Sequence, residues 1–297
     1  MDATLSLLLE RIFQTVFPLV AIVGLGYFCA RRTHTDMSVA NRINIDIFVP
    51  ALIFSVMAAK SFNPLEHADI ALGALLVVLA SGLLVWPVCR LIGVSPRTMV
   101  PPAMFNNSGN LGIPLIVLAF GEDALAAAVV LFLVENLLHF TLGMFILDSR
   151  TNLLQLARNP MILATASGLA WSLLGIPLPV AIKTPIDMLG QIAIPLMLFA
   201  LGVRMTSIDF SNWKPGAWGA VLTPLSGLIA AVPTIWLLGL EGEKAAFLIL
   251  FGVLPPAVLN YMVAERYNQE PHQVASIVLI GNVASLAVIP LTLAFIL

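Results

Sequence analysis

The sequence predicts an all-α polytopic membrane protein, built as a five-plus-five inverted repeat of ten transmembrane helices. Of its 297 residues, 60% are hydrophobic and 10% are charged, and the mean hydropathy is +1.00. A soluble domain carries about 25% charged residues. The apolar runs are long and continuous and lack the alternation that a membrane β-barrel requires. Two of the runs are interrupted by polar, proline-containing stretches, at 105–115 and 254–261.

At about 20 residues per span, the chain accommodates ten helices. Their expected limits are 5–30, 38–59, 69–92, 97–120, 122–148, 159–175, 179–204, 215–239, 243–267 and 272–296. The fourth and ninth are the interrupted ones. The first apolar segment lacks a basic leader and a small-residue cleavage site, so we interpret it as a retained helix and not as a signal peptide. A cytoplasmic linker at 149–158 separates the two repeats, 1–148 and 159–297.

The distribution of basic residues predicts the orientation. With the N-terminus outside, ten of the 14 Lys and Arg residues fall at cytoplasmic ends and four at outer ends. The cytoplasmic ten are Arg31, Arg32, Arg42, Arg90, Arg97, Arg150, Arg158, Arg204, Lys214 and Arg266, and the outer four are Arg11, Lys60, Lys183 and Lys244. By the positive-inside rule, both termini lie on the outer side. Cys29 and Cys89 fall at cytoplasmic helix ends and are predicted to be free thiols.

The two halves of the chain resemble each other. Residues 46–54 match residues 191–199 at an offset of 145, with Ile, Pro and Phe identical. The two interrupted stretches lie near the same offset. Because each half contains five helices, the second half enters the membrane from the opposite side, which is an inverted repeat.

The interrupted stretches are the candidate substrate site. Gly and Pro break a helix, and Asn competes for its backbone bonds. In lipid, unwound backbone persists only where protein or a watery cavity satisfies its N–H and C=O groups. A half-helix is expected to begin near Gly112 and another near Ala257, each directing free N–H groups and a positive dipole end into the cavity. The candidate binding residues are Asn106, Asn107, Ser108, Asn110, Gly112, Pro114, Pro255, Pro256, Asn260 and Tyr261.

Two such helix ends form an anion site without a buried Lys or Arg. A carboxylate fits this site best, because amide and N–H donors can satisfy both of its oxygens. The alternative is that the Asn and Pro residues are packing kinks satisfied by neighbouring helices.

The fifth predicted helix carries candidate ion-coupling residues. Glu135 and His139 are four positions apart and therefore share a face, at a depth where an ionisable group is expensive and usually functional. Asn136 is adjacent, and Asn282 occupies about the same place in the second repeat. Glu135 could carry a coupling proton or a sodium ion, and the nearby His139 favours the proton. The alternative is a Glu135–His139 pair that only fastens the helix.

Two further polar residues lie in the second and seventh predicted helices. Asp46 and Gln191 are related by the repeat, and each lies one turn before a proline. They could face the substrate, or they could be polar residues at helix ends that reach water. Lys183 and Asp187, four positions apart, are predicted to form a local ion pair.

Several function classes find no support in the sequence. His and Cys do not cluster at metal-ligand spacing, no Gly-rich phosphate loop follows a strand pattern, and a net charge of −2 gives no hint of nucleic acid. An enzyme would need a nucleophile or a metal beside Glu135 and His139. A channel is disfavoured because paired broken helices block the centre. We therefore predict a carrier without a cofactor, with a non-transporting sensor or receptor, or a channel, for a small anion as the alternative.

Three motifs, at 106–114, 255–266 and 44–54, resemble the auxin efflux carrier family. The resemblance covers essentially the whole chain. It implies a ten-helix fold akin to bile-acid sodium symporters, with a scaffold at 1–60 and 159–205 and a transport domain at 69–148 and 215–297. It also implies elevator-type movement of the transport domain and a homodimer through scaffold helices.

One departure from the family is the missing hydrophilic central loop of the plant members. The bacterial malonate and malate permeases are therefore the closer comparison. They imply a bacterial inner membrane, surrounding lipid, and a small organic anion other than auxin as substrate.

Overall fold

Helices make up the regular structure of the chain in this computed structural model, which describes residues 3–33, 35–59, 62–148, 158–207 and 213–297. In chain order the elements are α1 (Ala3–Thr33), α2 (Ser38–Ile43), η1 (Asn44–Phe48), α3 (Val49–Met57), η2 (Pro64–His67), α4 (Ala68–Ile92), α5 (Pro96–Met104), η3 (Ser108–Gly112), α6 (Ile113–Phe120), η4 (Glu122–Ala124), α7 (Leu125–Leu138), η5 (His139–Gly143), α8 (Met144–Leu147), α9 (Pro160–Leu174), α10 (Val180–Arg204), η7 (Met205–Ser207), α11 (Trp213–Leu238), α12 (Gly242–Val253), α13 (Leu259–Arg266) and α14 (Pro271–Ile296). The segments η1, η3 and η5 are π-helical turns.

Seven helical segments in the described part of the chain are long and apolar enough to cross a membrane. They are Ser6–Thr33, Ser38–Met57, Pro64–Ile92, Glu122–Leu147, Val180–Arg204, Trp213–Leu238 and Pro271–Ile296. The protein is therefore a multi-pass membrane protein. The other three predicted spans are the two interrupted segments and α9, which has only 15 residues, so ten crossings stay a prediction. Residues 149–157 of the predicted linker, with Arg150, and also Lys60, lie outside the described residues.

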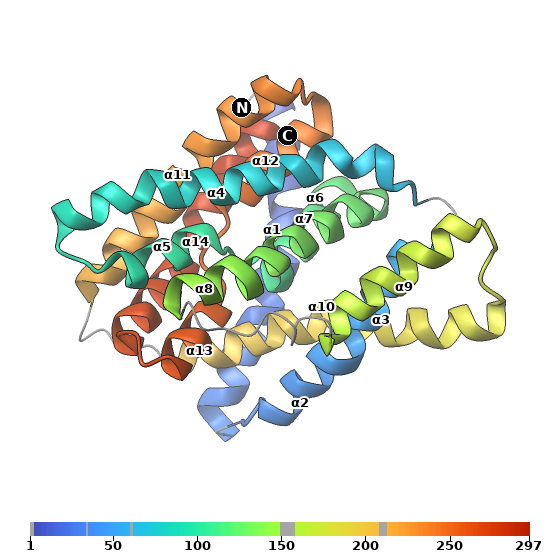
Figure 1. Cartoon of the computed structure of the whole chain (residues 1–297), viewed down its shortest axis with the longest axis horizontal. Coiled ribbons are helices and arrows are strands. Elements are labelled where there is room, and N and C mark those ends of the chain that lie inside the picture. The colour runs from blue at the N-terminus through green and yellow to red at the C-terminus, as the bar shows by residue number, and fades with distance from the viewer. Residues whose placement is uncertain (1–2, 34, 60–61, 149–157, 208–212) are drawn as a thin grey trace.

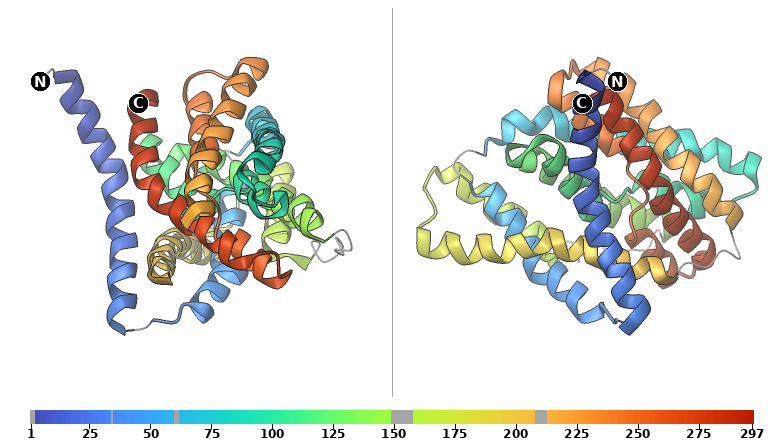
Figure 2. Two further views of the ribbon diagram at one scale, coloured as in Figure 1. Left: turned by 90° about the vertical axis from the view of Figure 1, so that its left-hand side faces the viewer. Right: turned by 180° about the vertical axis from the view of Figure 1, so that it is seen from behind.

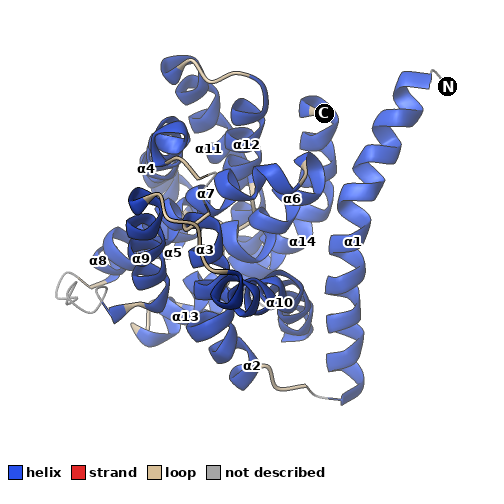
Figure 3. Ribbon diagram, turned by 90° about the vertical axis from the view of Figure 1, so that its right-hand side faces the viewer, coloured by secondary structure: helices blue, strands red, loops and turns tan. Residues whose placement is uncertain are grey.

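The helices pack in two groups. In the first, α1 packs on α10, and α3 packs on both α9 and α10. In the second, α11 packs on α14, α4 and α12, while α4 also packs on α5 and α7. Figure 1 shows α3, α9 and α10 together on one side, apart from α4, α11 and α12. Figures 2 and 3 show α1 at the edge of the molecule, and the start of α1 and the end of α14 at the same end.

Polar contacts hold each group together. Within the first group, Asp187 accepts a hydrogen bond from Ser55 and pairs with Lys183, so the predicted local ion pair is confirmed. Within the second, Lys244 Nζ lies 2.7 Å from Asp69 Oδ2. Cys29 and Cys89 are both free, as predicted.

Helices α1 and α10 approach closely because each offers a glycine to the other's backbone. A β-carbon at Gly26 would lie 2.1 Å from the Phe199 carbonyl oxygen, and one at Gly202 would lie 1.9 Å from that of Val23. Small residues permit such backbone approach between membrane helices, where packing replaces the hydrophobic effect as the driving force.

The substitution Gly26→Ala should therefore lower the stability of the purified protein. The added methyl meets a backbone oxygen that cannot move away alone, and overpacking of this kind costs about 1–3 kcal/mol. Gly24→Ala is the matched control, because it lies on the same helix with nothing within 4 Å of its β-carbon position. Thermal unfolding in detergent should show a lower midpoint for Gly26→Ala and no loss for Gly24→Ala. Equal midpoints would contradict the close packing of α1 on α10.

Candidate functional site

The two interrupted segments cross through a short antiparallel bridge. The N–H of Asn107 donates to the carbonyl of Pro255 at 2.7 Å, and the N–H of Ala257 donates to the carbonyl of Phe105 at 3.0 Å. Asn106 and Pro256 face each other between these two bonds. Proline has no N–H to give to a helix, so the segment at 255–256 cannot continue α12. The bridge supplies the bonds that the unwound backbone needs.

Three asparagine amides fasten the crossing. Asn106 Nδ2 donates to the Phe251 carbonyl, Asn260 Nδ2 to those of Phe105 (2.8 Å) and Ala257 (3.0 Å), and Asn282 Nδ2 to those of Pro256 (3.0 Å) and Val278 (2.8 Å). Only the amide nitrogen can donate to a carbonyl, so these bonds fix which amide atom faces which way. The side-chain donors of these three residues therefore serve the backbone.

Asn107 joins the crossing to the start of the first half-helix. Its Nδ2 donates to Asn282 Oδ1 at 3.2 Å. Its backbone carbonyl accepts from the N–H groups of Leu111 (3.1 Å) and Gly112 (3.0 Å), which closes the π-helical turn η3. Pro114 follows in the first turn of α6, where its missing N–H costs nothing.

The first turns of both half-helices keep free backbone donors. In the described residues, the N–H groups of Ser108, Gly109 and Asn110 have no backbone acceptor, and neither do those of Val258 and Leu259. The first N–H groups of any helix lack an intrahelical partner and carry its positive dipole end. Together the two ends offer five N–H groups.

These helix ends border one small cavity of about 160 Å³, which we call the crossover cavity. Its polar lining consists of Asn41, Asn44, Asn106, Asn107, Asn110, Glu135, Asn136, His139, Asn159 and Arg204, and Gly109, Val258 and Leu259 are also part of its wall. All three π-helical turns contribute, through Asn44 of η1, Asn110 of η3 and His139 of η5. Such turns often mark functional sites.

Glu135 is held at the cavity by its neighbours. Its Oε2 accepts from Ser108 Oγ at 3.0 Å, and its Oε1 lies 3.3 Å from His139 Nδ1, outside hydrogen-bond geometry. The Glu135 and His139 residues are 3% and 2% exposed. The His139 ring stacks on Phe105, with ring centroids 4.3 Å apart. The predicted shared face of Glu135 and His139 is confirmed.

Several buried oxygens around the crossing lack a partner. They are Asn44 Oδ1, Asn106 Oδ1, Glu135 Oε1, Asn136 Oδ1 and Asn260 Oδ1. The Asn136 amide nitrogen makes only a weak contact with Met161 Sδ at 3.7 Å. A buried acceptor without a donor costs about 1–3 kcal/mol. These atoms therefore favour the entry of a proton, a cation or a substrate donor.

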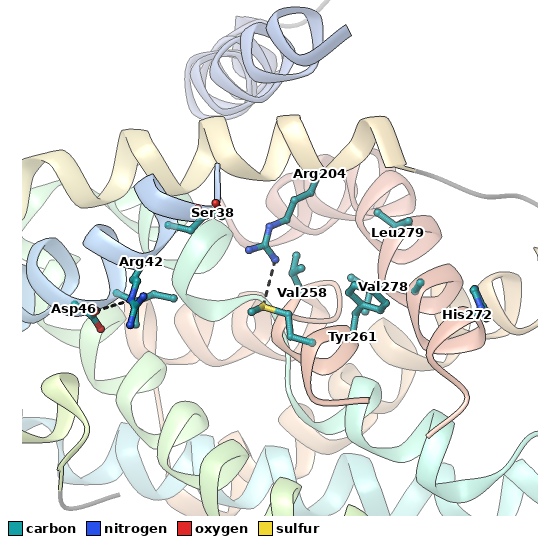
Figure 4. A pocket seen from close by; sticks show the side chains of 13 residues that line it. Ser38, Arg42, Asp46, Arg204, Val258, Tyr261, His272, Val278 and Leu279 are labelled. Atoms are coloured by element: carbon teal, nitrogen blue, oxygen red, sulfur yellow. Dashed lines mark hydrogen bonds and ion pairs between the residues drawn. The ribbon is translucent and has the colours of Figure 1, made fainter. Parts of the chain in front are cut away.

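Six of the predicted site residues line the crossover cavity, namely Asn106, Asn107, Asn110, Glu135, Asn136 and His139. Seven belong to the crossing but do not line this cavity, namely Ser108, Gly112, Pro114, Pro255, Pro256, Asn260 and Asn282, and the other three lie elsewhere. Tyr261 and Asp46 line an adjoining cavity of about 750 Å³, which we call the vestibule (Figure 4). There the Tyr261 hydroxyl donates to Glu265 Oε1 at 3.0 Å, and Asp46 Oδ2 lies 3.8 Å from Arg42 Nε. Gln191 is exposed on α10 and lines neither cavity.

Asn44 and Arg204 were not among the predicted site residues, although both line the crossover cavity. Asn44 is the first residue of the 44–54 motif, and an Asn that opens an apolar helix was the available signal. Arg204 counted only toward orientation, because a basic residue at a helix end is usually interfacial. It lies on the wall that the crossover cavity shares with the vestibule.

The sequence is similar to known membrane transporters along its whole length. The family described as "Membrane transport protein" matches residues 11–156 and 149–293. A protein of Rhizobium meliloti named "Putative malonate transporter" is 26% identical, with 95% of this chain and 94% of the relative covered. The Escherichia coli "Uncharacterized transporter YfdV" is 22% identical, covering 85% and 87%. Arabidopsis thaliana "Auxin efflux carrier component 6" is 26% identical over 45% of this chain and 25% of its own length.

The family match covers both halves of the chain, and these relatives include an auxin efflux carrier, so the resemblance drawn from the three motifs is confirmed. The chain belongs to the membrane transport protein family, whose members here are transporters and not enzymes.

Proposed function

We propose that the chain is a secondary transporter that carries a small carboxylate across a bacterial inner membrane. The carboxylate is held in the crossover cavity, between the first turns of the two half-helices. The observation that carries this proposal is a set of backbone N–H groups without backbone acceptors, four of which, at Gly109, Asn110, Val258 and Leu259, belong to residues that line one cavity of about 160 Å³. Helix N-termini are anion sites for this reason.

The size and polarity of the cavity support a small anion. Pockets for drug-sized ligands are about 300–1,000 Å³, so this one suits a solute of a few heavy atoms. Asn110 is only partly buried, and no hydrogen bond of its side chain is found within the described residues, so its amide is free to bind substrate. The Rhizobium meliloti relative, named for malonate transport, supports a carboxylate.

The proposed movement is that of an elevator, with the scaffold at 1–60 and 159–205 and the transport domain at 69–148 and 215–297. The two packing groups of helices support this division, and each draws helices from both halves of the chain. Inside the proposed transport domain, Lys244–Asp69 and Thr98–Glu270 join the two halves. Between the domains, the side-chain hydrogen bonds found in the described residues are two weak N–H···S contacts, Asn136–Met161 and Arg204–Met262. An interface with so few directional bonds can slide.

The remaining architecture follows from the same proposal. Ten crossings related by an inverted repeat place both termini outside, and the common end of the molecule at which α1 starts and α14 ends supports an even number. A homodimer through the scaffold helices stays a prediction, supported by the apolar side chains exposed on α9 and α10, such as Leu163 and Ile192.

Asn110→Ala should weaken carboxylate binding about ten- to hundredfold, because a hydrogen bond to a charged group contributes about 1.5–3 kcal/mol. The measurement is calorimetric titration of the purified protein with malonate. Gln191→Ala is the control, since it removes an amide that lines neither cavity. Asn260→Ala should weaken binding too, and should also lower the unfolding midpoint, because it removes donors to Phe105 and Ala257. An unchanged malonate affinity in Asn110→Ala would contradict the assignment of the substrate site.

Alternating access predicts that crosslinking across the domain interface depends on substrate. Leu111 of η3 and Leu201 of α10 line one apolar cavity between the proposed domains. In a protein without Cys29 and Cys89, a cysteine pair at 111 and 201 should crosslink at different rates with and without malonate. A pair at Ser55 and Asp187, which touch within the scaffold, should crosslink equally in both conditions. Equal rates for both pairs would argue for a static protein.

We also propose that Glu135 carries the coupling ion. Its Oε1 has no hydrogen bond, and Ser108, which holds its Oε2, belongs to the half-helix at the crossing. The stacked His139 favours a proton, whereas the unpartnered oxygens of Asn44 and Asn136 favour a cation with oxygen ligands. Imposing a proton or a sodium gradient separately distinguishes the two ions.

Glu135→Gln keeps the shape and the Ser108 contact but removes the charge. In proteoliposomes it should abolish gradient-driven accumulation of malonate while leaving malonate exchange measurable. Glu265→Gln makes the same chemical change at an exposed position and should transport normally. If the Glu135→Gln protein still concentrates substrate against a gradient, Glu135 is structural. Wild-type protein that binds malonate but shows no flux would be a sensor.

A further inference from the structure

We propose that Arg204 forms a second anion subsite, which makes the crossover cavity discriminate between substrates with two carboxylates and those with one. The proposal rests on the function proposed above and names the residue that binds the second carboxylate of the substrate. Arg204 is the last residue of α10, in the proposed scaffold. It lines both the crossover cavity and the vestibule, and the dashed line drawn from Arg204 in Figure 4 marks its contact with the sulfur of Met262.

The Arg204 guanidinium has no anionic partner in the described part of the chain. The close pairs of basic and acidic side chains found there are Arg42–Asp46, His139–Glu135, Lys183–Asp187 and Lys244–Asp69. The one hydrogen bond of the Arg204 side chain runs from Nη1 to Met262 Sδ at 3.8 Å. A thioether is a weak acceptor, whereas a guanidinium offers five N–H donors. The group therefore has donors to spare.

The carboxylates that line these two cavities, Asp46 and Glu135, are engaged elsewhere. Asp36, which lines a neighbouring pocket with Arg204, accepts hydrogen bonds from Ser38. Asp46, which also lines the vestibule, pairs with Arg42 one turn earlier on its own segment. In Figure 4 this pair lies to the left of Arg204. Glu135 lines the crossover cavity but accepts from Ser108 and faces His139. The positive charge of Arg204 is thus left for a solute in the cavity.

The crossover cavity has two positive regions, one from each proposed domain. One is the set of free N–H groups at Gly109, Asn110, Val258 and Leu259, from the proposed transport domain. The other is Arg204, from the proposed scaffold. A solute with two carboxylates can bind both, and the guanidinium fork suits a carboxylate in bidentate geometry. A solute with one carboxylate can bind only one of them.

The test compares malonate with monomethyl malonate, which has nearly the same shape but only one carboxylate. Affinities are measured by calorimetric titration of purified wild-type, Arg204→Gln, Arg204→Lys and Arg266→Gln proteins. Arg204→Gln should weaken malonate binding about ten- to hundredfold, the loss expected for a hydrogen bond to a charged group, and should leave the monoester nearly unaffected. Arg204→Lys keeps the charge but loses the fork, so its malonate affinity should be intermediate.

Arg266→Gln is the matched control, because Arg266 is exposed and lines neither cavity, and it should leave both affinities nearly unchanged. An unchanged malonate affinity in Arg204→Gln would overturn the proposal, and so would equal losses for both ligands. Asn110→Ala separates the two levels of inference, since it should weaken both ligands. If Asn110→Ala weakens both and Arg204→Gln weakens neither, the second subsite fails while the carboxylate site stands. If wild-type protein binds neither ligand, both inferences fail.

Discussion

The backbone of a membrane-embedded chain must find its hydrogen bonds inside the protein, and the crossing of the two interrupted segments is where that requirement is hardest to meet. Two reciprocal bonds, from Asn107 to Pro255 and from Ala257 to Phe105, replace the helical ones. The amides of Asn106, Asn260 and Asn282 satisfy further carbonyls. Among the backbone donors of the crossing that the structure describes, the first N–H groups of the two half-helices remain free. The candidate site therefore consists of backbone donors that the fold leaves without acceptors, and a substrate carboxylate would accept their hydrogen bonds.

This arrangement divides the polar groups by task. Asparagine nitrogens hold the crossing in place, backbone N–H groups face the cavity, and the charges of Glu135 and Arg204 border it from the two packing groups. The separation has a physical reason. Side-chain amides can reach carbonyls that lose their helical donors where the helix is broken. The free N–H groups, in contrast, point along the helix axis at the positive end of the helix dipole. A site built from main-chain donors needs no buried positive charge of its own, so Arg204 is available to add selectivity.

The sequence was sufficient to predict what depends on local spacing. The interruptions follow from Gly, Pro and Asn inside apolar runs, and the neighbours Glu135 and His139 follow from a separation of four residues. It could not predict which atom of each asparagine is engaged, because residue type does not fix amide orientation. Tyr261 follows Asn260 by one position, about 100° around a helix, and so faces the vestibule instead of the crossing. The position of Arg204 at the cavity could not be predicted, because the cavity wall is formed by segments far apart in the chain.

The most direct measurement is a structure of the protein determined by electron cryomicroscopy with malonate bound. We expect density for one carboxylate against the N–H groups of Gly109, Asn110, Val258 and Leu259, inside the crossover cavity. Density for malonate elsewhere, with those N–H groups still free, would contradict the claim that the two half-helix ends form the substrate site.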